Sequence, residues 1–144
     1  MKRYESYSEG DTLSLARKLG EAANEGDIFC LIGDLGVGKT VFSKGFAQGM
    51  GIDEHITSPT FTIVHEYEGV LPLYHFDVYR ISDASEMDEI GYEEYFYGQG
   101  VCLIEWANII PEIIPQSAKY ITIEKDLEKG FDYRIITIEE GGQR

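Results

Sequence analysis

Residues 33–40 combine glycines with a lysine and a hydroxyl side chain at a spacing suited to holding phosphate groups. Gly33, four further residues and then Gly38, Lys39 and Thr40 fit the pattern G-x-x-x-x-G-K-[ST]. Glycines let the backbone curl so that successive N–H groups point at phosphate oxygens. Lys39 is expected to reach the β- and γ-phosphates of a nucleotide, and the Thr40 hydroxyl is expected to bind Mg²⁺. The residues assigned to the nucleotide here are Leu35, Gly36, Val37, Gly38, Lys39 and Thr40.

The segments on either side of this loop supply the context that a phosphate-binding loop requires. The apolar run Ile28–Ile32 predicts a strand, and residues 41–47 predict a helix that ends near Gly49 or Gly51. A helix that starts where the loop ends turns its partly positive N-terminus toward the same phosphates. A glycine-rich turn that binds nothing would not need this order of strand, loop and helix. We therefore expect a nucleotide site.

A site of this kind needs a second acid to hold Mg²⁺, commonly at the end of a strand. Glu105 and Asp77 each close a run of strand length, and the run before Glu105 is the more purely apolar. We expect Glu105 to hold the metal and Asp77 to orient or deprotonate the attacking water. Arg80 either neutralises charge in the transition state or pairs with Asp77 or a helix end, and both roles stay open. Lys39, Asp77 and Arg80 are the catalytic candidates.

Three further features near these residues carry weaker signals. His75 alternates with Phe76 and is interpreted as a core residue more readily than as a site residue. Trp106 is interpreted as core, although its place beside Glu105 leaves a site-lining role open. Residues 58–60, Ser-Pro-Thr, fall where P-loop switch proteins sense the γ-phosphate, but an ordinary turn also fits them.

The remaining pattern predicts a mixed sheet with helices. A helix is expected from Asp11 or Thr12 to about Ala23, and the acidic segment 82–96 predicts one or two short helices capped by Asp83 or Ser85. The expected strands are 4–8, 28–32, 62–67, 71–78, 101–104, 120–125 and 133–138. Because 62–67 with 71–78 and 120–125 with 133–138 form hairpins, parallel and antiparallel strands share one sheet. We predict a P-loop NTPase-like three-layer α/β fold that forms a single domain over residues 1–144.

The composition restricts the class of partner. The chain has 144 residues and a formal net charge of −14, from 12 basic and 26 acidic residues. Nucleic-acid phosphates repel such a surface, so we expect no DNA binding and any role near RNA to depend on a basic partner. We recognise no apolar run of about eighteen residues and no signal peptide, so no membrane association is expected. Cys30 and Cys102 lie in apolar runs and are expected to be reduced core residues, which fits the cytoplasm.

Four stretches together resemble the TsaE family (formerly YjeE), the bacterial ATPases of the machinery that makes threonylcarbamoyladenosine in tRNA. These stretches are residues 33–40, 58–61, 75–80 and 104–106, and their order, their spacing and the chain length all agree. The phosphate loop alone is unspecific, whereas S-P-T-F and H-x-D-x-Y-R together make the resemblance specific. Ala107 departs from the family, since many members carry another acid there.

The resemblance implies a small α/β P-loop fold that binds ATP and Mg²⁺ and hydrolyses ATP slowly. It implies two partners, TsaB and TsaD, of which TsaD transfers the threonylcarbamoyl group to adenosine 37 of tRNA. In this family TsaE resets that complex between cycles, and it meets tRNA only through the complex. By the same resemblance Thr40 and Glu105 hold Mg²⁺. Asp77 is a catalytic candidate, and Thr12 lies near the adenine.

Two other functions compete with this interpretation. A kinase for a small molecule or nucleoside usually has a lid whose arginines clamp the phosphates, and only Arg80 lies in the middle of this chain. A nucleotide switch that does not hydrolyse ATP would use the same loop as a binding module. Release of phosphate distinguishes the switch from the ATPase, and transfer of phosphate to an acceptor distinguishes the kinase.

Overall fold

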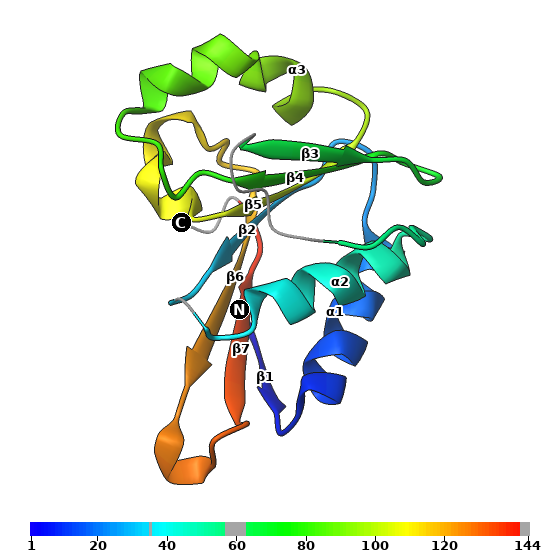
Figure 1. The fold of residues 1–144 in the computed structure, drawn as a ribbon, viewed down its shortest axis with the longest axis vertical. Coiled ribbons are helices and arrows are strands. Elements are labelled where there is room, and N and C mark those ends of the chain that lie inside the picture. Colours follow the sequence, from blue (N-terminus) through cyan, green and yellow to red (C-terminus); the bar gives the residue numbers. More distant parts are fainter. Residues whose placement is uncertain (35, 57–62, 142–144) are drawn as a thin grey trace.

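One mixed sheet runs through the part of the chain that the computed structural model describes, which is residues 1–34, 36–56 and 63–141. Its seven strands follow the order β1-β7-β6-β2-β5-β4-β3 (Figure 1). The strands are β1 Lys2–Ser6, β2 Ile28–Ile32, β3 Val64–Tyr67, β4 Leu73–Asp77, β5 Val101–Glu105, β6 Lys119–Lys125 and β7 Arg134–Glu139. Leu35, the Ser-Pro-Thr segment at 58–60 and the expected start of a strand at residue 62 lie outside the described residues.

The centre of the sheet is parallel, and both of its edges are antiparallel. β2 pairs in parallel with β5 and β6, and β5 pairs in parallel with β4. β3 forms an antiparallel hairpin with β4 at one edge, while β7 pairs antiparallel with β6 and β1 at the other. Both predicted hairpins and the mixed sheet are therefore confirmed. The parallel centre also brings the carboxyl ends of β2, β4 and β5 to the same end of the sheet.

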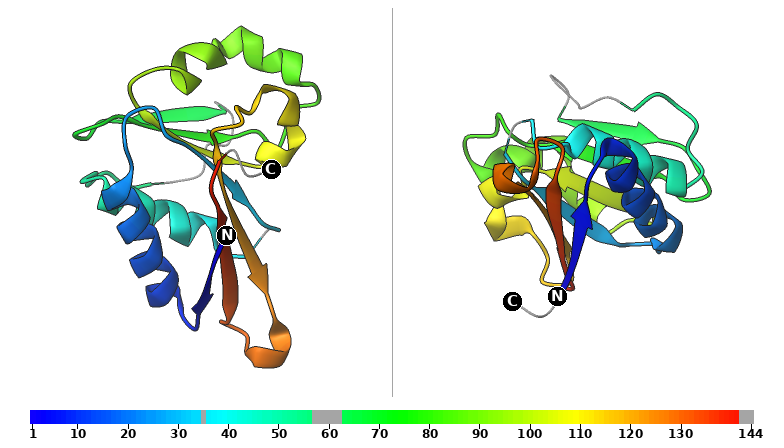
Figure 2. Two further views of the ribbon diagram at one scale, coloured as in Figure 1. Left: turned by 180° about the vertical axis from the view of Figure 1, so that it is seen from behind. Right: turned by 90° about the horizontal axis from the view of Figure 1, so that it is seen from below.

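Helices cover both faces of the sheet and make three layers, as expected. Figures 1 and 2 show α1 and α2 side by side on one face, with α3 on the other. The helical elements are α1 Glu9–Ala22, α2 Lys39–Gly49, η1 Ala84–Ile90, α3 Tyr92–Phe96, η2 Ala107–Ile109, η3 Pro111–Ile113 and η4 Leu127–Lys129. Successive side chains along each strand point to opposite faces of the sheet, so each face contributes to its own apolar cluster. One cluster lies under α1 and α2, and the other lies under η1 and α3. The predicted P-loop NTPase-like three-layer fold is confirmed.

Helices α1 and α2 touch through glycines, which brings their backbones unusually close. A Cβ on Gly20 would overlap the carbonyl oxygen of Phe46, and a Cβ on Gly49 would overlap the carbonyl oxygen of Arg17. Glycine is therefore required at both positions by the neighbouring helix. This contact fixes the position of α2, whose first residue is Lys39.

Two boundaries near the N-terminus differ from the sequence prediction. The helix α1 starts at Glu9, before the predicted caps at Asp11 or Thr12, because Ser8 is the N-cap. The Ser8 hydroxyl accepts from the Asp11 N–H at 3.1 Å, and the Asp11 carboxylate accepts from the Tyr7 N–H at 2.9 Å. The carboxylate of Asp11 thus holds the residue that precedes the cap. The first strand accordingly spans Lys2–Ser6, not 4–8.

Two other expectations concern the core and the membrane. Cys30 and Cys102 are buried and unbridged, as a core role requires. Within the described ranges no helix has the length and apolar character needed to cross a bilayer.

Candidate nucleotide-binding site

The phosphate loop leaves β2 and ends where α2 begins. Gly36 and Gly38 have φ values of 77° and 111°, in the left-handed region that favours glycine. A Cβ placed on either residue would have no described atom within 4 Å, so the space beside the backbone is open. Gly38 is the N-cap of α2 and no side chain caps it. The first N–H groups of α2 are therefore suited to receiving an anion.

The base of the loop is held by close packing. A Cβ on Gly33 would lie 2.7 Å from a methyl carbon of Val37 and 2.9 Å from the carbonyl oxygen of Ile123. Val37 itself is 2% exposed and belongs to the core cluster under α1 and α2. Only glycine at residue 33 lets the loop lie this close to β6. The loop is thus fixed at its base and open at its rim.

Lys39 points back into the loop and away from bulk water. Its side chain is buried, with 6% exposed, and Nζ donates to the carbonyl oxygen of Gly33 at 2.7 Å. Nζ also lies 3.7 Å from the centroid of the Trp106 ring, a cation–π contact. Burial lowers the pKa of Lys39, and the carboxylates of Glu105 and Asp77 act in the opposite direction. The ammonium is therefore a poorly solvated charge close to both predicted acids.

Asp77 and Glu105 lie side by side at the carboxyl ends of neighbouring parallel strands. Their Cα atoms are register partners between β4 and β5. Glu105 is 3% exposed, whereas Asp77 is half-buried and accepts from the Tyr79 N–H at 3.0 Å. Desolvation raises the pKa of Asp77, and the charge of Glu105 adds to this effect. The structure thus brings together Lys39, Asp77 and Glu105, as the sequence predicted.

His75 is the site residue that sequence reasoning missed. Its Nε2 lies 2.6 Å from Oε2 of Glu105, and both side chains are almost fully buried. The sequence analysis favoured a core role from the alternation of residues 75 and 76. The sequence did contain a signal for a site role. His75 precedes Asp77 by two residues, and residues two apart on a strand share a face. His75 therefore lies on the face of the sheet that carries both acids.

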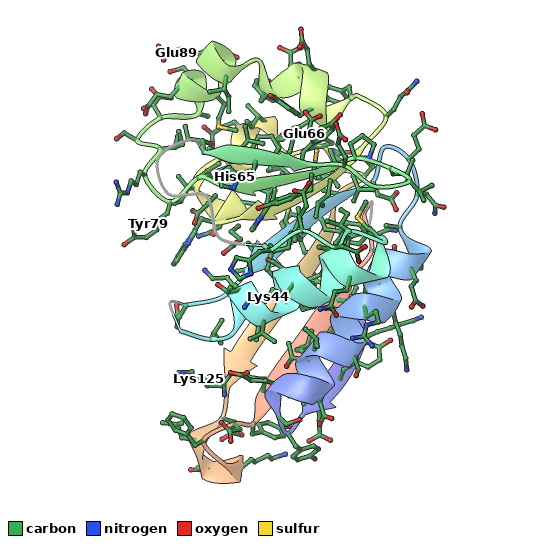
Figure 3. All side chains as sticks on the ribbon, turned by 45° about the vertical axis from the view of Figure 1, so that its right-hand side comes forward. Lys44, His65, Glu66, Tyr79, Glu89 and Lys125 are labelled. Carbon is green, nitrogen blue, oxygen red and sulfur yellow. The ribbon has the colours of Figure 1, made fainter. Side chains whose placement is uncertain are left out.

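The segment after β5 places Trp106 against the loop lysine. Trp106 has a φ of 64°, one of two positive values among the described non-glycine residues, and its ring centroid lies 4.8 Å from that of Tyr79. Figure 3 shows Tyr79 beyond the end of β4, where it is exposed. Trp106 thus lines the site, which was the alternative left open for it. Arg80 follows Tyr79 and is also exposed.

A cavity of about 230 Å³ lies beside the phosphate loop. Thr12 lines it and is 4% exposed, and its hydroxyl lies 2.7 Å from that of Ser6. Lys125, labelled in Figure 3 at the end of β6, and Phe131 also line it. The cavity continues from the loop residues Gly36 and Gly38, so a ligand whose phosphates occupy the loop would have its remaining part here.

Arg134 is a second residue that sequence reasoning did not assign to the site. It lines the same cavity from β7, and its Nε donates to the carbonyl oxygen of Val37 at 2.7 Å. An arginine near the C-terminus, far from every motif, gives no pattern by which the sequence could have revealed this contact.

The donors present fit a magnesium ion that is shared with phosphates. No group of three or more His, Cys, Asp or Glu side chains suited to holding a metal occurs in the described part of the chain. Mg²⁺ bound with a nucleotide needs only one or two protein oxygens, because phosphates and water complete its octahedron. Thr40 is exposed at the start of α2, and Glu105 offers a carboxylate at the end of β5. These two residues match that requirement.

The fold and the loop together define a class, that of α/β proteins with a P-loop NTPase-like fold. Residues 6–135 match the family described as "Threonylcarbamoyl adenosine biosynthesis protein TsaE". The chain is 48% identical to the tRNA threonylcarbamoyladenosine biosynthesis protein TsaE of Bacillus subtilis (strain 168), over 99% of this chain and 87% of that protein. It is 43% identical to the TsaE protein of Treponema pallidum (strain Nichols), over 82% of this chain and 87% of that protein.

A solved structure agrees with this relationship. The crystal structure titled as that of Bacillus subtilis YdiB superposes with a TM-score of 0.81 and 44% identity, over 99% of this chain and 87% of that one. The chain belongs to the TsaE family, as its motifs indicated.

Proposed function

We propose that this protein is a Mg²⁺-dependent ATP hydrolase that acts in tRNA threonylcarbamoyladenosine biosynthesis. The observation that carries this proposal is the convergence of Lys39, Asp77 and Glu105 beside an open phosphate loop. A loop lysine, an acid that can hold Mg²⁺ and a residue that can position the attacking water are parts that P-loop hydrolases combine. The pathway is inferred from the family and from its relatives in Bacillus subtilis and Treponema pallidum.

Each residue has a distinct part in this proposal. The loop N–H groups and Lys39 hold the β- and γ-phosphates, and the cavity beside Thr12 holds the nucleoside. Thr40 and Glu105 would hold Mg²⁺, which when bound would supply the positive charge that neutralises the phosphates. These assignments use only side chains that already surround the loop.

Asp77 is the residue we assign to the attacking water. Its raised pKa moves the carboxylate closer to the basicity that a general base needs. Asp77 accepts a proton from water as the water oxygen bonds to the γ-phosphorus, and the bond to the bridging β–γ oxygen breaks to release ADP. Arg80, exposed in the following turn, is the candidate for neutralising charge on the transferred group.

The proposed partners are TsaD and TsaB homologues, with tRNA reached only through them. The net charge of −14 suits docking against a basic face, which would make association sensitive to salt. A partner that completes the site would explain how a slow ATPase is switched on. In this scheme ATP turnover resets the complex after each transfer to adenosine 37.

The test is phosphate release from ATP by the chain alone and with purified TsaB and TsaD, at low and high salt. We expect slow release alone, a rise of about tenfold or more with both partners at low salt, and a smaller rise at high salt. Lys39→Ala should abolish release, while Lys44→Ala, on the same helix, should not. Absence of phosphate release in every mixture would reject the hydrolase and favour a nucleotide switch.

A further inference from the structure

His75 is a buried polar residue on a face of the sheet whose central strands are mainly apolar. The side chains of the central strands that face α1 and α2 are buried and form one cluster, which includes Phe29, Leu31, Leu73, Val101, Leu103 and Ile121. His75 lies on β4 between Leu73 and Asp77, and its register partner on β5 is Leu103. It is 1% exposed. An imidazole at this position has lost its hydration and must find its partner inside the protein.

The partner of the imidazole is Glu105. The 2.6 Å separation of Nε2 and Oε2 is short for a nitrogen–oxygen pair, as expected when the acceptor is a carboxylate. Nδ1 of His75 is buried and has no hydrogen-bond partner among the described residues. An ionised Glu105 can only accept, so with that carboxylate Nε2 is the donor and carries the proton that joins the two side chains. The ring therefore acts as a donor aimed at one oxygen of Glu105.

A purely structural role explains this pair poorly. Placing an acid and a histidine on an apolar face costs desolvation of both groups, and two apolar side chains would pack there at no such cost. The contact fixes the orientation of the Glu105 carboxyl group, because a donor bonded to Oε2 restricts its rotation. Glu105 lies at the end of β5, two residues beyond the register partner of His75, and the phosphate loop and Lys39 are nearby.

We propose that His75 is a positioning residue that holds Oε2 of Glu105 so that Oε1 is presented to the cation of a bound magnesium nucleotide. The inference rests on the proposed function, since it assigns a support to the proposed metal ligand. Residues that support a ligand in this way typically account for about 10- to 100-fold in metal affinity. His75 touches neither nucleotide nor water in this scheme and acts only through Glu105.

The experiment compares nucleotide binding with and without magnesium. A non-hydrolysable ATP analogue is titrated calorimetrically into wild type, His75→Phe, His75→Gln and Glu105→Gln, once with Mg²⁺ and once with EDTA. Gln places an amide donor near the position of Nε2, whereas Phe keeps the volume and removes the donor. His65→Phe is the matched control, because His65 is the register partner of His75 on β3 and is not bonded to Glu105.

We expect affinity in EDTA to agree within about twofold for all variants, since the loop itself is unchanged. The increase in affinity that Mg²⁺ produces should be about 10- to 100-fold smaller in His75→Phe and Glu105→Gln than in wild type. His75→Gln and His65→Phe should keep most of this increase. The double variant His75→Phe/Glu105→Gln should lose no more of the magnesium-dependent affinity than Glu105→Gln alone. If Mg²⁺ increases the affinity of His75→Phe as much as that of wild type, this inference is overturned and the proposed function is left intact. Wild type without any magnesium gain would overturn the proposed metal site and the inference with it.

A second measurement does not depend on whether the Phe variant folds. Nitrogen NMR of the histidine rings in the wild-type protein reports which ring nitrogen is protonated, and the His75→Gln spectrum assigns the signal among the three histidines. We expect a proton on Nε2 of His75 and a shift of that signal in Glu105→Gln. A ring protonated at Nδ1 alone would overturn the proposal, because Nε2 could not then donate to Glu105.

Discussion

Arg134 donates from β7 to the carbonyl oxygen of Val37 in the phosphate loop, 97 residues earlier in the chain. The same guanidinium donates through Nη1 to the carbonyl oxygens of Phe131, at 2.9 Å, and Tyr133, at 2.8 Å. Because all three acceptors are backbone atoms, the arginine joins the turn between β6 and β7 to the loop whatever side chains surround it. The C-terminal hairpin thus helps to set the shape of the nucleotide site.

Arg134→Ala should weaken nucleotide binding without disrupting the fold. Loss of a hydrogen bond from a charged donor typically costs about 1.5–3 kcal/mol. Because this bond holds the phosphate loop, we expect the affinity for ADP to fall by roughly tenfold. Isothermal titration measures this. Arg3→Ala, an exposed arginine on β1, is the control and should bind ADP as wild type does. Equal affinity in both variants would mean that the loop keeps its shape without the arginine.

The contact between Lys39 and Trp106 gives an optical signal for nucleotide binding. Trp106 is the single tryptophan, and Lys39 Nζ lies 3.7 Å from its ring centroid. Phosphates should draw the ammonium away from the ring, so we expect tryptophan fluorescence to change on addition of ADP. Lys39→Ala should show an altered starting signal and no response, and Lys44→Ala should respond as wild type. An unchanged spectrum at saturating ADP in wild type would contradict this.

Asp77→Asn should raise stability while removing activity. The pKa of Asp77 is raised above its ordinary value of 3.8, so the folded state binds this proton more tightly than the unfolded state does. The free energy of unfolding therefore falls as pH rises through 3.8 to the folded pKa, and the ionised carboxylate costs stability at pH 7. Asn removes that cost and can still accept from the Tyr79 N–H.

Urea denaturation at two pH values measures this effect. We expect Asp77→Asn to be more stable than wild type at about pH 7, with the difference shrinking near pH 3.5, and its phosphate release to be about 100-fold slower or more. Asp53→Asn, at an exposed position, is the control and should retain activity. A variant that is less stable than wild type at neutral pH would show that Asp77 contributes favourable contacts that outweigh its desolvation.

Gly20→Ala should destabilise the protein through the contact of α1 with α2. A Cβ on Gly20 would overlap the carbonyl oxygen of Phe46, so the helices must separate. Forcing such an overlap typically costs about 1–3 kcal/mol, which would lower the melting temperature by several degrees. Gly10→Ala is a matched control in α1, since its Cβ would meet only the Ser8 hydroxyl at 3.6 Å. That change should leave the melting temperature unchanged or raise it, because alanine favours helix.

The sequence predicted well those features that depend on local pattern. The sequence shows the strand before the phosphate loop, the helix after it and the two hairpins. Each is visible as a repeat of apolar residues that ends at a glycine-containing turn. The sequence also placed Asp77 and Glu105 each at the end of a strand, near the loops where ligands bind in α/β proteins. The predicted start of α1 at Asp11 or Thr12 is wrong because Ser8 is the N-cap and its hydroxyl accepts from the Asp11 N–H, three residues later.

The features that escaped prediction are contacts between distant parts of the chain. The bond from His75 to Glu105 depends on the register of β4 against β5, which no single segment encodes. The bond from Arg134 to Val37 depends on β7 folding back along β6 toward the loop. The glycines of α1 and α2 look unfavourable for helix, and only the neighbouring backbone explains them.

The order of strands has a consequence for synthesis on the ribosome. β2 leads into the phosphate loop, yet its two neighbours in the sheet, β5 and β6, begin at residues 101 and 119. A growing chain therefore displays the phosphate-binding sequence long before it has the sheet that shapes it. We expect unfinished chains, such as one stalled before β6, to bind no ATP in a nucleotide-crosslinking assay. Competence to bind ATP would then arise only after β6 has been made, so shorter products would not compete for nucleotide with chains that contain it.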